Sequence, residues 1–180
     1  MSKKVLILST SPRRNSNSEA LAEAFAKGAM DAGNNVEIIR MREKIIRFCT
    51  GCFACQKTGK CVVKDDMSEI IPKMEQADAL AFATPIYYYE MSGQMKTLLD
   101  RANPLFVADY RFRDVYFLSS AAEDEAFVPQ RAQSGLEGWI ECFEKARLAG
   151  AVFGGGVTEV GEIAGHPALA MAYEMGKAIL

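Results

Sequence analysis

The segment from residue 3 to residue 26 constrains this chain most, because it reads as a strand, a polar loop and a helix in succession. Residues 3–8 form a short apolar run rich in β-forming side chains. Residues 9–18 are hydroxyl, amide and arginine side chains apart from Pro12. Leu21, Phe25 and Gly28 then recur at spacings of three and four, which predicts a helix with one buried face. Such a unit directs free backbone N–H groups and the positive end of the helix dipole at an anion.

The composition of the loop at residues 9–18 favours a single terminal phosphate as that anion. Hydroxyl and amide groups supply neutral donors, and arginine supplies a charged fork. The loop contains no glycine and matches neither G-x-x-x-x-G-K-[ST] nor G-x-G-x-x-G, the two common nucleotide loops. The alternative is an ordinary helix cap, for which each residue from 15 to 18 is suited. One capping residue would be enough for that role, so we favour the phosphate cradle.

Strand-like and helix-like segments alternate along the rest of the chain. The expected strands are residues 3–8, 36–39, 79–83, 115–118 and 151–153, and the later helices are expected near residues 67–76, 92–101, 136–143 and 167–180. Asp66 with Glu69 predicts a capping box before residue 67. Five βα repeats predict one α/β domain over residues 1–180, with a parallel sheet and helices on both of its faces. Residues 84–90 are expected to be a loop.

Charge and hydropathy exclude several classes of partner. The net charge is −2 at pH 7, so nothing indicates nucleic acid or an anionic membrane surface. No apolar run approaches the ~20 residues of a membrane-spanning helix, and the run after residue 4 is too short for a signal peptide. We therefore expect a cytoplasmic protein. Its five cysteines then suggest thiols, a metal site or redox chemistry rather than structural disulfides.

An aromatic segment follows the third expected strand. Residues 84–89 read Thr-Pro-Ile-Tyr-Tyr-Tyr, and three consecutive tyrosines at a strand end are unusual for a core alone. A proline-restrained loop with aromatic side chains suits a flat ring system such as an isoalloxazine, which needs apolar contact and a few backbone hydrogen bonds. Exposed tyrosines at a subunit interface are the alternative, and Tyr89 is the one that suits it best.

Two motifs resemble the NADPH-dependent FMN reductase branch of the flavodoxin-like superfamily. Residues 9–18, Ser-Thr-Ser-Pro-Arg-Arg-Asn-Ser-Asn-Ser, are similar to G/S-S-P-R-x-x-S/G-N-S/T. Residues 84–101 are similar to S/T-P-[IV]-Y-x-x-x-[MV]-[ST]-[GA]-x-[ML]-K-x-[LF]-[LI]-D-R. The resemblance implies a three-layer, doubly wound, five-stranded parallel sheet in the order 2-1-3-4-5, with the ligand at the carboxyl ends of the strands beside the switch point between strands 1 and 3.

The same resemblance implies which residues bind FMN. The phosphate would be surrounded by Ser11, Arg13, Ser16, Asn17 and Ser18, with Ser9 standing where the family often has glycine. The ring would be lined by Pro85, Ile86, Tyr87 and Tyr88. Ser119 and Ser120 are candidates by position, because the loop after the fourth strand commonly completes the pocket. Lys96, Asp100 and Arg101 would orient their helix or build a dimer interface.

In this reading the protein is an oxidoreductase that passes electrons from NAD(P)H through FMN to a small acceptor: a flavin, a quinone or another aromatic molecule. No side chain is nominated as catalytic, because hydride transfer to a flavin requires no protein base. The resemblance also implies a homodimer or tetramer, in which a second subunit completes the flavin site. A rival is a flavodoxin-like binding module that holds another phosphate and no flavin.

Four cysteines leave a second alternative open. Cys49, Cys52, Cys55 and Cys61 have the spacing C-x2-C-x2-C-x5-C, similar to the iron–sulfur flavoproteins of the same superfamily. These thiols would then hold a [4Fe-4S] cluster, with a ferredoxin-like protein as electron-transfer partner. The same string also resembles plain FMN reductases without a cluster, while zinc or a disulfide within the loop would also suit the thiols.

Two further residues carry smaller expectations. Cys142 falls on the helix near residues 136–143 and is expected to be a buried, inert thiol. His166 is the only histidine, in Gly-His-Pro before the last expected helix. We favour a capping or structural role for it over that of a catalytic base.

Overall fold

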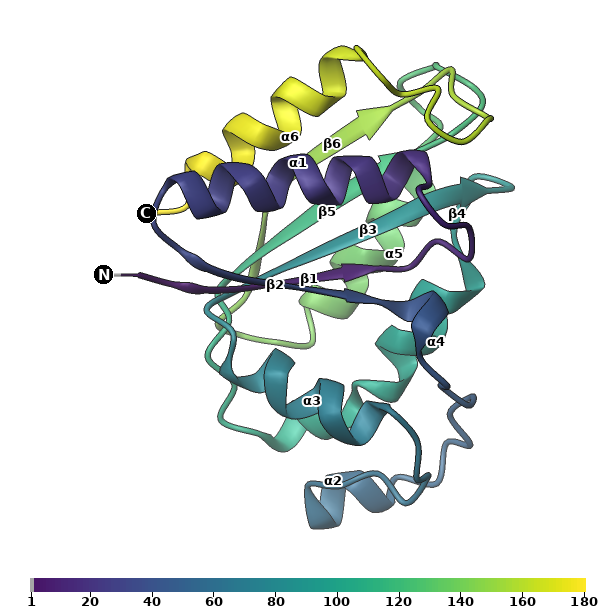
Figure 1. The fold of residues 1–180 in the computed structure, drawn as a ribbon. Helices are drawn as coiled ribbons and strands as arrows, with labels where there is room; N and C mark the ends of the chain where they lie inside the picture. The colour runs from purple at the N-terminus through teal and green to yellow at the C-terminus, as the bar shows by residue number, and fades with distance from the viewer. Residues whose placement is uncertain (1) are drawn as a thin grey trace.

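A parallel β-sheet lies at the centre of the molecule (Figure 1). The computed structural model describes residues 2–180. Five strands lie side by side in the order β2-β1-β3-β5-β6, and neighbours on this path run parallel. Numbered along the chain, they have the order 2-1-3-4-5, which confirms the predicted doubly wound α/β fold. The strands are β1 (Lys4–Ser9), β2 (Asn35–Arg40), β3 (Ala79–Tyr87), β5 (Asp114–Ser120) and β6 (Arg147–Gly154).

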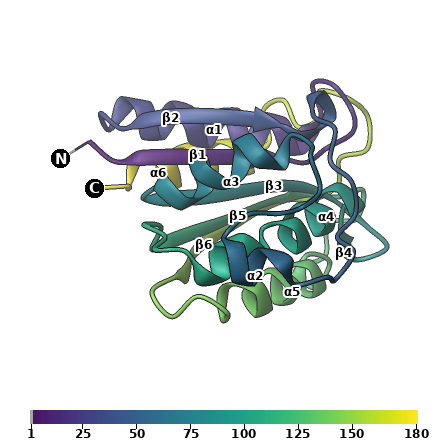
Figure 2. The ribbon, with the colours of Figure 1, turned by 90° about the horizontal axis from the view of Figure 1, so that it is seen from below.

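Helices cover both faces of the sheet, so the fold has three layers. Figure 1 shows α1 (Asn17–Asp31) and α6 (Pro167–Lys177) on one face. The other face carries α3 (Met67–Gln76), α4 (Gly93–Arg101) and α5 (Gln130–Ile140), with the short α2 (Ala54–Thr58) on the same side (Figure 2). Two 3₁₀ helices, η1 (Met41–Glu43) and η2 (Asn103–Val107), lie in connections. None of the helices in residues 2–180 has the length and apolarity that a membrane crossing requires.

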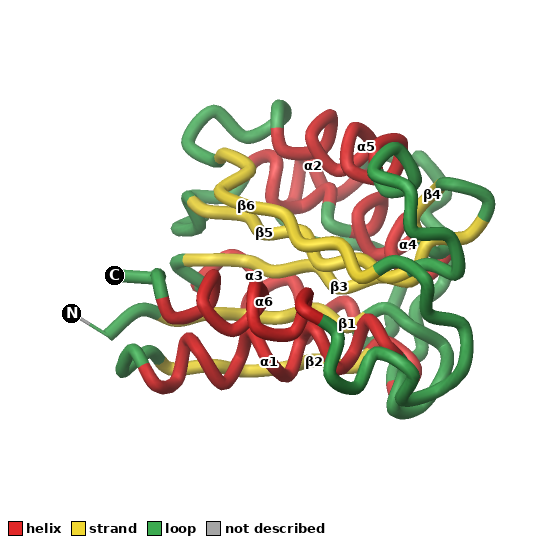
Figure 3. The backbone as a smooth tube through the Cα atoms, turned by 90° about the horizontal axis from the view of Figure 1, so that it is seen from above, coloured by secondary structure: helices red, strands yellow, loops and turns green. Residues whose placement is uncertain are grey.

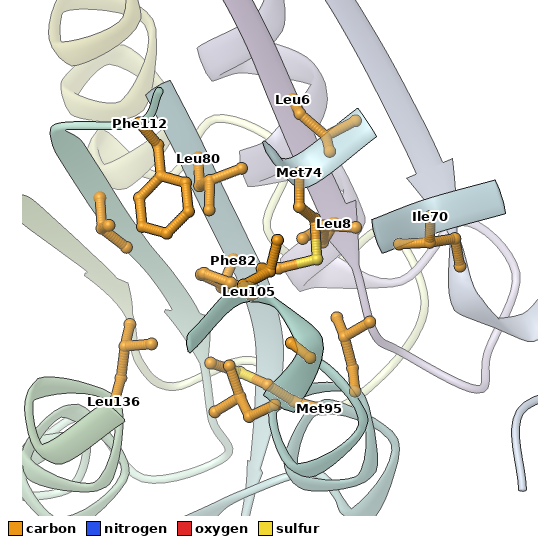
Figure 4. Close-up of a cluster of buried hydrophobic side chains, with 14 of the residues drawn as sticks. Leu6, Leu8, Ile70, Met74, Leu80, Phe82, Met95, Leu105, Phe112 and Leu136 are labelled. Atoms are coloured by element: carbon orange, nitrogen blue, oxygen red, sulfur yellow. The ribbon is translucent and has the colours of Figure 1, made fainter. Parts of the chain in front are cut away.

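The central strands are buried on both faces, which explains their unbroken apolar sequences. On the face of α3 and α4, Leu8 and Phe82 pack with Met74 and Met95 in one hydrophobic cluster (Figure 4). On the opposite face, the cluster contains Ile7 and Ala81 from the sheet together with Leu21 and Phe25 from α1. The helix face predicted to be buried from the spacing of Leu21 and Phe25 is therefore the face that packs on the sheet.

Helices α1 and α6 approach each other closely at two glycines. A Cβ atom on Gly28 would lie 1.9 Å from the carbonyl oxygen of Tyr173, and one on Gly176 would lie 2.0 Å from that of Phe25. Any side chain at either position would collide with backbone, which cannot move aside as a flexible side chain can. The C-terminal helix is thus fitted directly against the helix that begins at the polar loop.

The segment at residues 84–90, expected to be a loop, instead forms the end of one strand and the turn of a β-hairpin. Strand β3 continues to Tyr87, and β4 (Glu90–Met91) returns antiparallel to it, with Ile86 opposite Met91. Tyr88 and Tyr89 form the turn with φ of 51° and 65°, a left-handed conformation that residues other than glycine rarely adopt. The prediction was wrong here because Pro85 and the run of tyrosines suggested a strand end, whereas pairing with β5 and β4 prolongs the strand.

The predicted capping box at Asp66 and Glu69 is also wrong. The Asp66 side chain makes no cap and accepts a hydrogen bond from the Ile45 N–H (2.6 Å). The N–H of Met67 is bound by Asp65 instead (3.1 Å). Asp66 therefore anchors the long connection after β2, a contact between distant residues that a local capping motif cannot reveal.

The carboxyl ends of the parallel strands meet at one edge of the sheet, opposite the two chain termini (Figure 3). Connecting loops gather at this edge. Thr10, directly after β1, donates its backbone N–H (2.8 Å) and its hydroxyl (2.9 Å) to the carbonyl oxygen of Ala83 in β3. These bonds fix the first loop beside the end of β3, at the switch point predicted to hold the ligand.

Candidate functional site

The N-terminus of α1 opens toward the carboxyl edge of the sheet. Ser16 caps the helix, and its Oγ accepts a hydrogen bond from the Glu19 N–H (3.2 Å). The first main-chain bond of the helix runs from the Ala20 N–H to the Ser16 oxygen (3.0 Å). The amide groups at the very start of α1 therefore precede its internal ladder and face an incoming ligand. The loop thus contains a helix cap, and the cap leaves amide groups at the helix start that a ligand could accept hydrogen bonds from.

A buried carboxylate in the first turn of α1 is neutralised by two arginines. Glu19 contacts Arg40 and Arg42, with 2.7 Å between the Arg42 Nη1 and the Glu19 Oε2. Burial by itself raises the pKa of Glu19, but the hydrogen bonds from Arg42 and Arg40 outweigh it, so the net pKa lies below its usual value. Because this charge is paired, it leaves the helix terminus available to a negative ligand.

Two predicted phosphate residues also bind the loop that follows β6. Arg13 donates from Nη1 to the Thr158 carbonyl oxygen (2.9 Å). Asn17 donates to the Glu159 carbonyl oxygen (3.0 Å) and accepts a hydrogen bond from the Ile163 N–H (3.3 Å). The β1–α1 loop and the β6–α6 loop therefore close on each other across the end of the sheet.

A single pocket lies where these loops meet the end of β3 and β5. It brings together side chains from four segments: Ser11, Arg13, Ser16 and Asn17 from the first loop, Pro85, Ile86 and Tyr87 from β3, Ser120, Ala121 and Ala122 after β5, and Val157, Thr158 and Val160 after β6. One end of this pocket is polar and carries a guanidinium, and the other is largely apolar. This arrangement can hold a molecule that joins an anionic group to a flat ring.

Some of the predicted binding residues are not in that pocket. Ser9, Ser18 and Ser119 are buried but do not line it. Ser18 lies beside the capping hydroxyl of Ser16 (3.4 Å between the two Oγ atoms). Within residues 2–180, the hydroxyls of Ser9 and Ser119 have no hydrogen-bond partner. Tyr88 is 97% exposed at the hairpin tip and also lies outside the pocket.

The contribution of the β6–α6 loop was not anticipated. Val157, Thr158 and Val160 line the pocket, although no residue of this loop was among the candidates predicted from the sequence. The sequence feature that could have indicated the contribution of this loop is the pair of glycines after β6, Gly155 and Gly156. A Cβ atom on Gly155 would lie 2.5 Å from the Asp124 Cα atom, so glycine is needed for this loop to pack against the loop after β5.

His166 caps α6, as expected. Its Nδ1 accepts a hydrogen bond from the Ala168 N–H (3.1 Å), with Pro167 at the first helical position. The His166 N–H donates in turn to the carbonyl oxygen of Ile163 (2.9 Å). This residue therefore orients the end of the β6–α6 loop, consistent with a structural role.

The cysteine-containing connection is held to α4 by a buried arginine. Arg101 donates to both oxygens of Asp65 (2.6 and 2.9 Å) and to the carbonyl oxygen of Arg47 (2.6 Å). Its guanidinium also donates more weakly to the Val63 carbonyl oxygen (3.4 Å). Arg101 thus holds this segment against α4, a role that was not expected of it, while Lys96 and Asp100 form an exposed pair on the same helix (2.6 Å).

Four cysteines line a separate pocket, the cysteine pocket, beside α4 and η2. Cys49 and Cys52 are exposed, Cys61 is half-buried, and Cys55 is buried and accepts a hydrogen bond from the Asn103 side chain (3.1 Å). The Ala54 N–H and the Thr50 hydroxyl hold the pKa of the Cys52 thiol below its usual value. As arranged in the described part of the chain, no three His, Cys, Asp or Glu side chains are placed to share one metal ion.

Cys142 is exposed, so the prediction of a buried thiol was wrong. Helix α5 ends at Ile140, and Cys142 lies in the turn beyond it, where its thiol faces the Gly138 carbonyl oxygen (3.6 Å). The apolar period that includes Trp139 and Phe143 continued past the actual helix end, which placed Cys142 on the wrong surface.

Residues 3–140 match the family described as NADPH-dependent FMN reductase. An iron–sulfur flavoprotein of Archaeoglobus fulgidus is 39% identical over 94 residues, which cover 52% of this chain and 43% of that protein. A putative NAD(P)H-dependent FMN-containing oxidoreductase of Bacillus subtilis, YwqN, is 32% identical over 125 residues, covering 69% of this chain and 64% of that protein. The matched part spans about half the length of the iron–sulfur flavoproteins.

Solved structures share the fold over nearly the whole chain. The NAD(P)H:quinone oxidoreductase from Methanothermobacter marburgensis superposes with a TM-score of 0.77 at 20% identity, covering 98% of this chain and 96% of that one. At this identity the similarity establishes the architecture. The residues that act must be argued from the site itself.

Proposed function

This chain belongs to the NADPH-dependent FMN reductase family, and on that premise we propose that it binds FMN at the carboxyl edge of the sheet. The proposed activity is electron transfer from NADH or NADPH through FMN to a small acceptor such as a quinone, an azo compound or a free flavin. One observation carries the proposal: the polar N-terminus of α1 and the apolar end of β3 line the same pocket.

The polar end of the pocket fits the phosphate of FMN. Ser11 and Ser16 offer hydroxyl groups, Asn17 lies at the first helical position, and Arg13 supplies the positive charge. To bind a phosphate, Arg13 would exchange its hydrogen bond to the neutral Thr158 carbonyl oxygen for bonds to an anion, in which both partners are charged and two parallel bonds can form. The helix dipole adds to the attraction for a negative group.

The apolar end of the pocket fits the isoalloxazine ring. Pro85, Ile86 and Tyr87 offer a wall whose backbone is held in strand pairing, and Ser120 and Ala121 continue this wall beside Pro85 at the end of β5. Bound FMN supplies the ability to accept a hydride and to release electrons. The protein's part is to orient the ring, limit water around it and anchor the phosphate, so no side chain is assigned a proton-transfer role.

A matched pair of arginines tests the FMN site. Arg13 lines the pocket, whereas the adjacent Arg14 is exposed and does not. We expect Arg13→Gln to weaken FMN binding about 10- to 100-fold, the range for a hydrogen bond to a charged group. Arg14→Gln should leave FMN affinity unchanged. Riboflavin, which lacks the phosphate, should bind the Arg13→Gln and Arg14→Gln variants with similar affinity. Calorimetry on apoprotein measures these affinities.

Equal affinities for FMN and riboflavin in the unmodified protein would contradict the phosphate site. The reductase activity is tested separately by the visible spectrum of FMN-loaded protein under argon. We expect NADH or NADPH to bleach the flavin band, and an acceptor quinone to restore it. A flavin band that responds to neither nucleotide would count against the reductase.

The cysteine pocket supports a second candidate function, an iron–sulfur flavoprotein that carries electrons to or from a ferredoxin-like protein. The supporting observation is that Cys49, Cys52, Cys55 and Cys61 line one pocket, and thiolates are the ligands of such clusters. Assay of anaerobically purified protein would then find iron and acid-labile sulfide in equal amounts. Cys52→Ala should lose both, while Cys142→Ala, outside the pocket, should retain them.

A homodimer or tetramer is the assembly we propose. Tyr88 at the hairpin tip is 97% exposed, and Tyr87 beside it is 41% exposed. Exposed aromatic side chains next to a ligand pocket are typical of surfaces that another subunit covers. Light scattering on FMN-loaded protein tests the assembly, and a monomer with FMN fully bound would contradict it.

A further inference from the structure

A second pocket adjoins the one at the end of α1 and shares a wall with it. Ile86, Tyr87, Ala121 and Ala122 line both pockets. The second pocket is lined by residues of the β3–β4 hairpin and by residues of the loop after β5. A molecule in the second pocket would therefore lie next to the ligand of the first.

The second pocket is aromatic with one charged group. Tyr88, Tyr89, Glu123 and Val128 complete its lining, so Glu123 is the only ionisable acid or base there apart from the tyrosines. In residues 2–180, no cation forms an ion pair with this carboxylate. A flat apolar molecule can lie against the tyrosines, but it must do so beside an unneutralised negative charge.

Tyr89 holds that charge in place. Its hydroxyl donates to both carboxylate oxygens of Glu123, at 3.0 and 3.2 Å. The Tyr89 ring stacks on Phe127 with 5.9 Å between centroids, and the Arg131 guanidinium lies 5.8 Å from its centre. The Glu123 carboxylate raises the pKa of Tyr89, which keeps the phenol a hydrogen-bond donor.

We propose that the second pocket receives flat, uncharged aromatic electron acceptors and that Glu123 selects against anionic ones. This inference rests on the proposed FMN function. In the reaction, a quinone gains two electrons and two protons and becomes a hydroquinone, and the reduced flavin loses the same electrons and protons. Glu123 is a specificity-determining residue and takes no part in this transfer.

The size of the effect follows from the position of the charge. Glu123 is solvent-exposed, so its repulsion of an anion a few ångströms away is strongly screened. We expect about a three- to tenfold discrimination rather than an absolute barrier, in line with like charges near a wet surface. The discrimination should weaken at high salt, because mobile ions screen exposed charges.

The test compares one neutral and one anionic acceptor on the FMN-loaded protein. The flavin is first reduced with dithionite under argon, so that the nucleotide plays no part, and is then mixed with 1,4-naphthoquinone or 1,4-naphthoquinone-2-sulfonate. Stopped-flow absorbance gives the two reoxidation rate constants. The ratio of the two rate constants in one protein cancels any difference that affects both acceptors equally. The intrinsic reactivities of the two quinones cancel when this ratio is compared between proteins.

We expect Glu123→Gln to lower the ratio of neutral to anionic rate constants about three- to tenfold. Glu125→Gln is the matched control: it removes the same charge from the same loop but outside the pocket, and should change the ratio much less than Glu123→Gln does. Raising the salt concentration should lower the ratio in the unmodified protein and have little effect in the Glu123→Gln variant.

A second readout requires no turnover. Binding of 2-naphthol and naphthalene-2-sulfonate to the oxidised holoprotein can be followed through the flavin spectrum, and Glu123→Gln should tighten binding of the sulfonate relative to the naphthol. Equal ratios in all three proteins, with normal flavin loading and reduction, would overturn this inference and leave the reductase proposal standing. Failure of the unmodified protein to bind or reduce FMN would overturn both.

Discussion

Arg101 and Asp65 form a buried, two-pronged ion pair, with Nη1 2.6 Å from Oδ2 and Nη2 2.9 Å from Oδ1. Neither side chain is more than 2% exposed. The pair joins α4 to the cysteine-containing connection, and Arg101 also reaches the carbonyl oxygen of Arg47. A charge buried this deeply is tolerated only because its partner and several hydrogen bonds compensate for lost hydration.

Removing one member of that pair should destabilise the protein strongly. We expect Arg101→Met, which keeps most of the side-chain volume, to lower the free energy of unfolding by about 3–5 kcal/mol, because Asp65 is left buried without a counter-charge. Urea denaturation measures the change. The control is Lys96→Met in the exposed pair with Asp100 on the same helix, which should cost less than about 1 kcal/mol. Similar losses in the two variants would contradict the role given to Arg101.

The same pair makes stability depend on pH in the acid range. Burial by itself raises the pKa of Asp65, but the hydrogen bonds from Arg101 and from the N–H groups of Arg47 and Met67 outweigh it and lower the net pKa. A lowered pKa means that the folded protein takes up this proton less readily than the unfolded chain does. The stabilisation is therefore complete above the unfolded value of about 4 and is lost as the pH falls below it.

Unfolding free energies measured from pH 3 to pH 7 check this sign. The difference between the unmodified protein and Asp65→Asn should be large near pH 6–7 and should shrink progressively as the pH falls below about 4, where Asp65 of the unfolded chain is protonated before that of the folded protein. Asp109→Asn serves as the control, because the Asp109 side chain is 95% exposed. Its difference from the unmodified protein should stay small throughout, and a difference for Asp65→Asn that grows toward low pH would refute the sign.

The contact between α1 and α6 predicts opposite effects for two glycine substitutions. Gly28→Ala would place a Cβ atom 1.9 Å from the Tyr173 carbonyl oxygen, so we expect a loss of about 1–3 kcal/mol or more from forced backbone movement. Gly138, also inside a helix, has open space around its Cα atom. Gly138→Ala should raise stability by about 0.5–1 kcal/mol through helix propensity. Thermal unfolding distinguishes the signs, and a neutral Gly28→Ala would mean that the helices lie further apart.

The hairpin turn predicts a stabilising substitution at an exposed tyrosine. Tyr88 has φ of 51°, which costs about 1–2 kcal/mol for most residues other than glycine, and asparagine tolerates this region better. Because Tyr88 is 97% exposed, its side chain contributes little packing within one subunit, so the prediction applies to protein diluted to the monomer. Tyr88→Asn should therefore raise the free energy of unfolding by about 1 kcal/mol in chemical denaturation. Tyr87→Asn, in the adjacent strand, should lower it, and a loss in both variants would show that Tyr88 makes a stabilising contact.

The helix starts that the sequence determined correctly depend on neighbours only a few residues apart. His166 with Pro167 begins α6, as its local pattern predicted, and the helix expected near residues 92–101 begins after Ser92, which accepts the N–H of Met95 (3.3 Å). The unbroken apolar run at residues 79–83 likewise identified a strand buried on both faces. Caps and hydrophobic periods can be predicted because each is a short-range property of the chain.

Two of the predictions that were wrong depend on residues far apart in the chain. Asp66 binds Ile45 instead of capping its own helix, and the tyrosine segment is drawn into a hairpin by pairing between strands. In both cases the local pattern was compatible with two outcomes, and long-range contacts selected one. Cys142 was misplaced for a different reason: α5 ends at Ile140, whereas the apolar pattern continues past it.

The sequence by itself determined the parallel α/β architecture and the polar character of the loop before α1, since strand and helix periods and capping residues are encoded locally. Only the tertiary structure decided what that loop faces. It placed Thr158 against Arg13, 145 residues away in the chain, and left Tyr88 out of the pocket at the start of α1, although its neighbour Tyr87 lines that pocket. The physical reason is that a pocket forms from the ends of several strands at once, and no single stretch of sequence contains the distances between them.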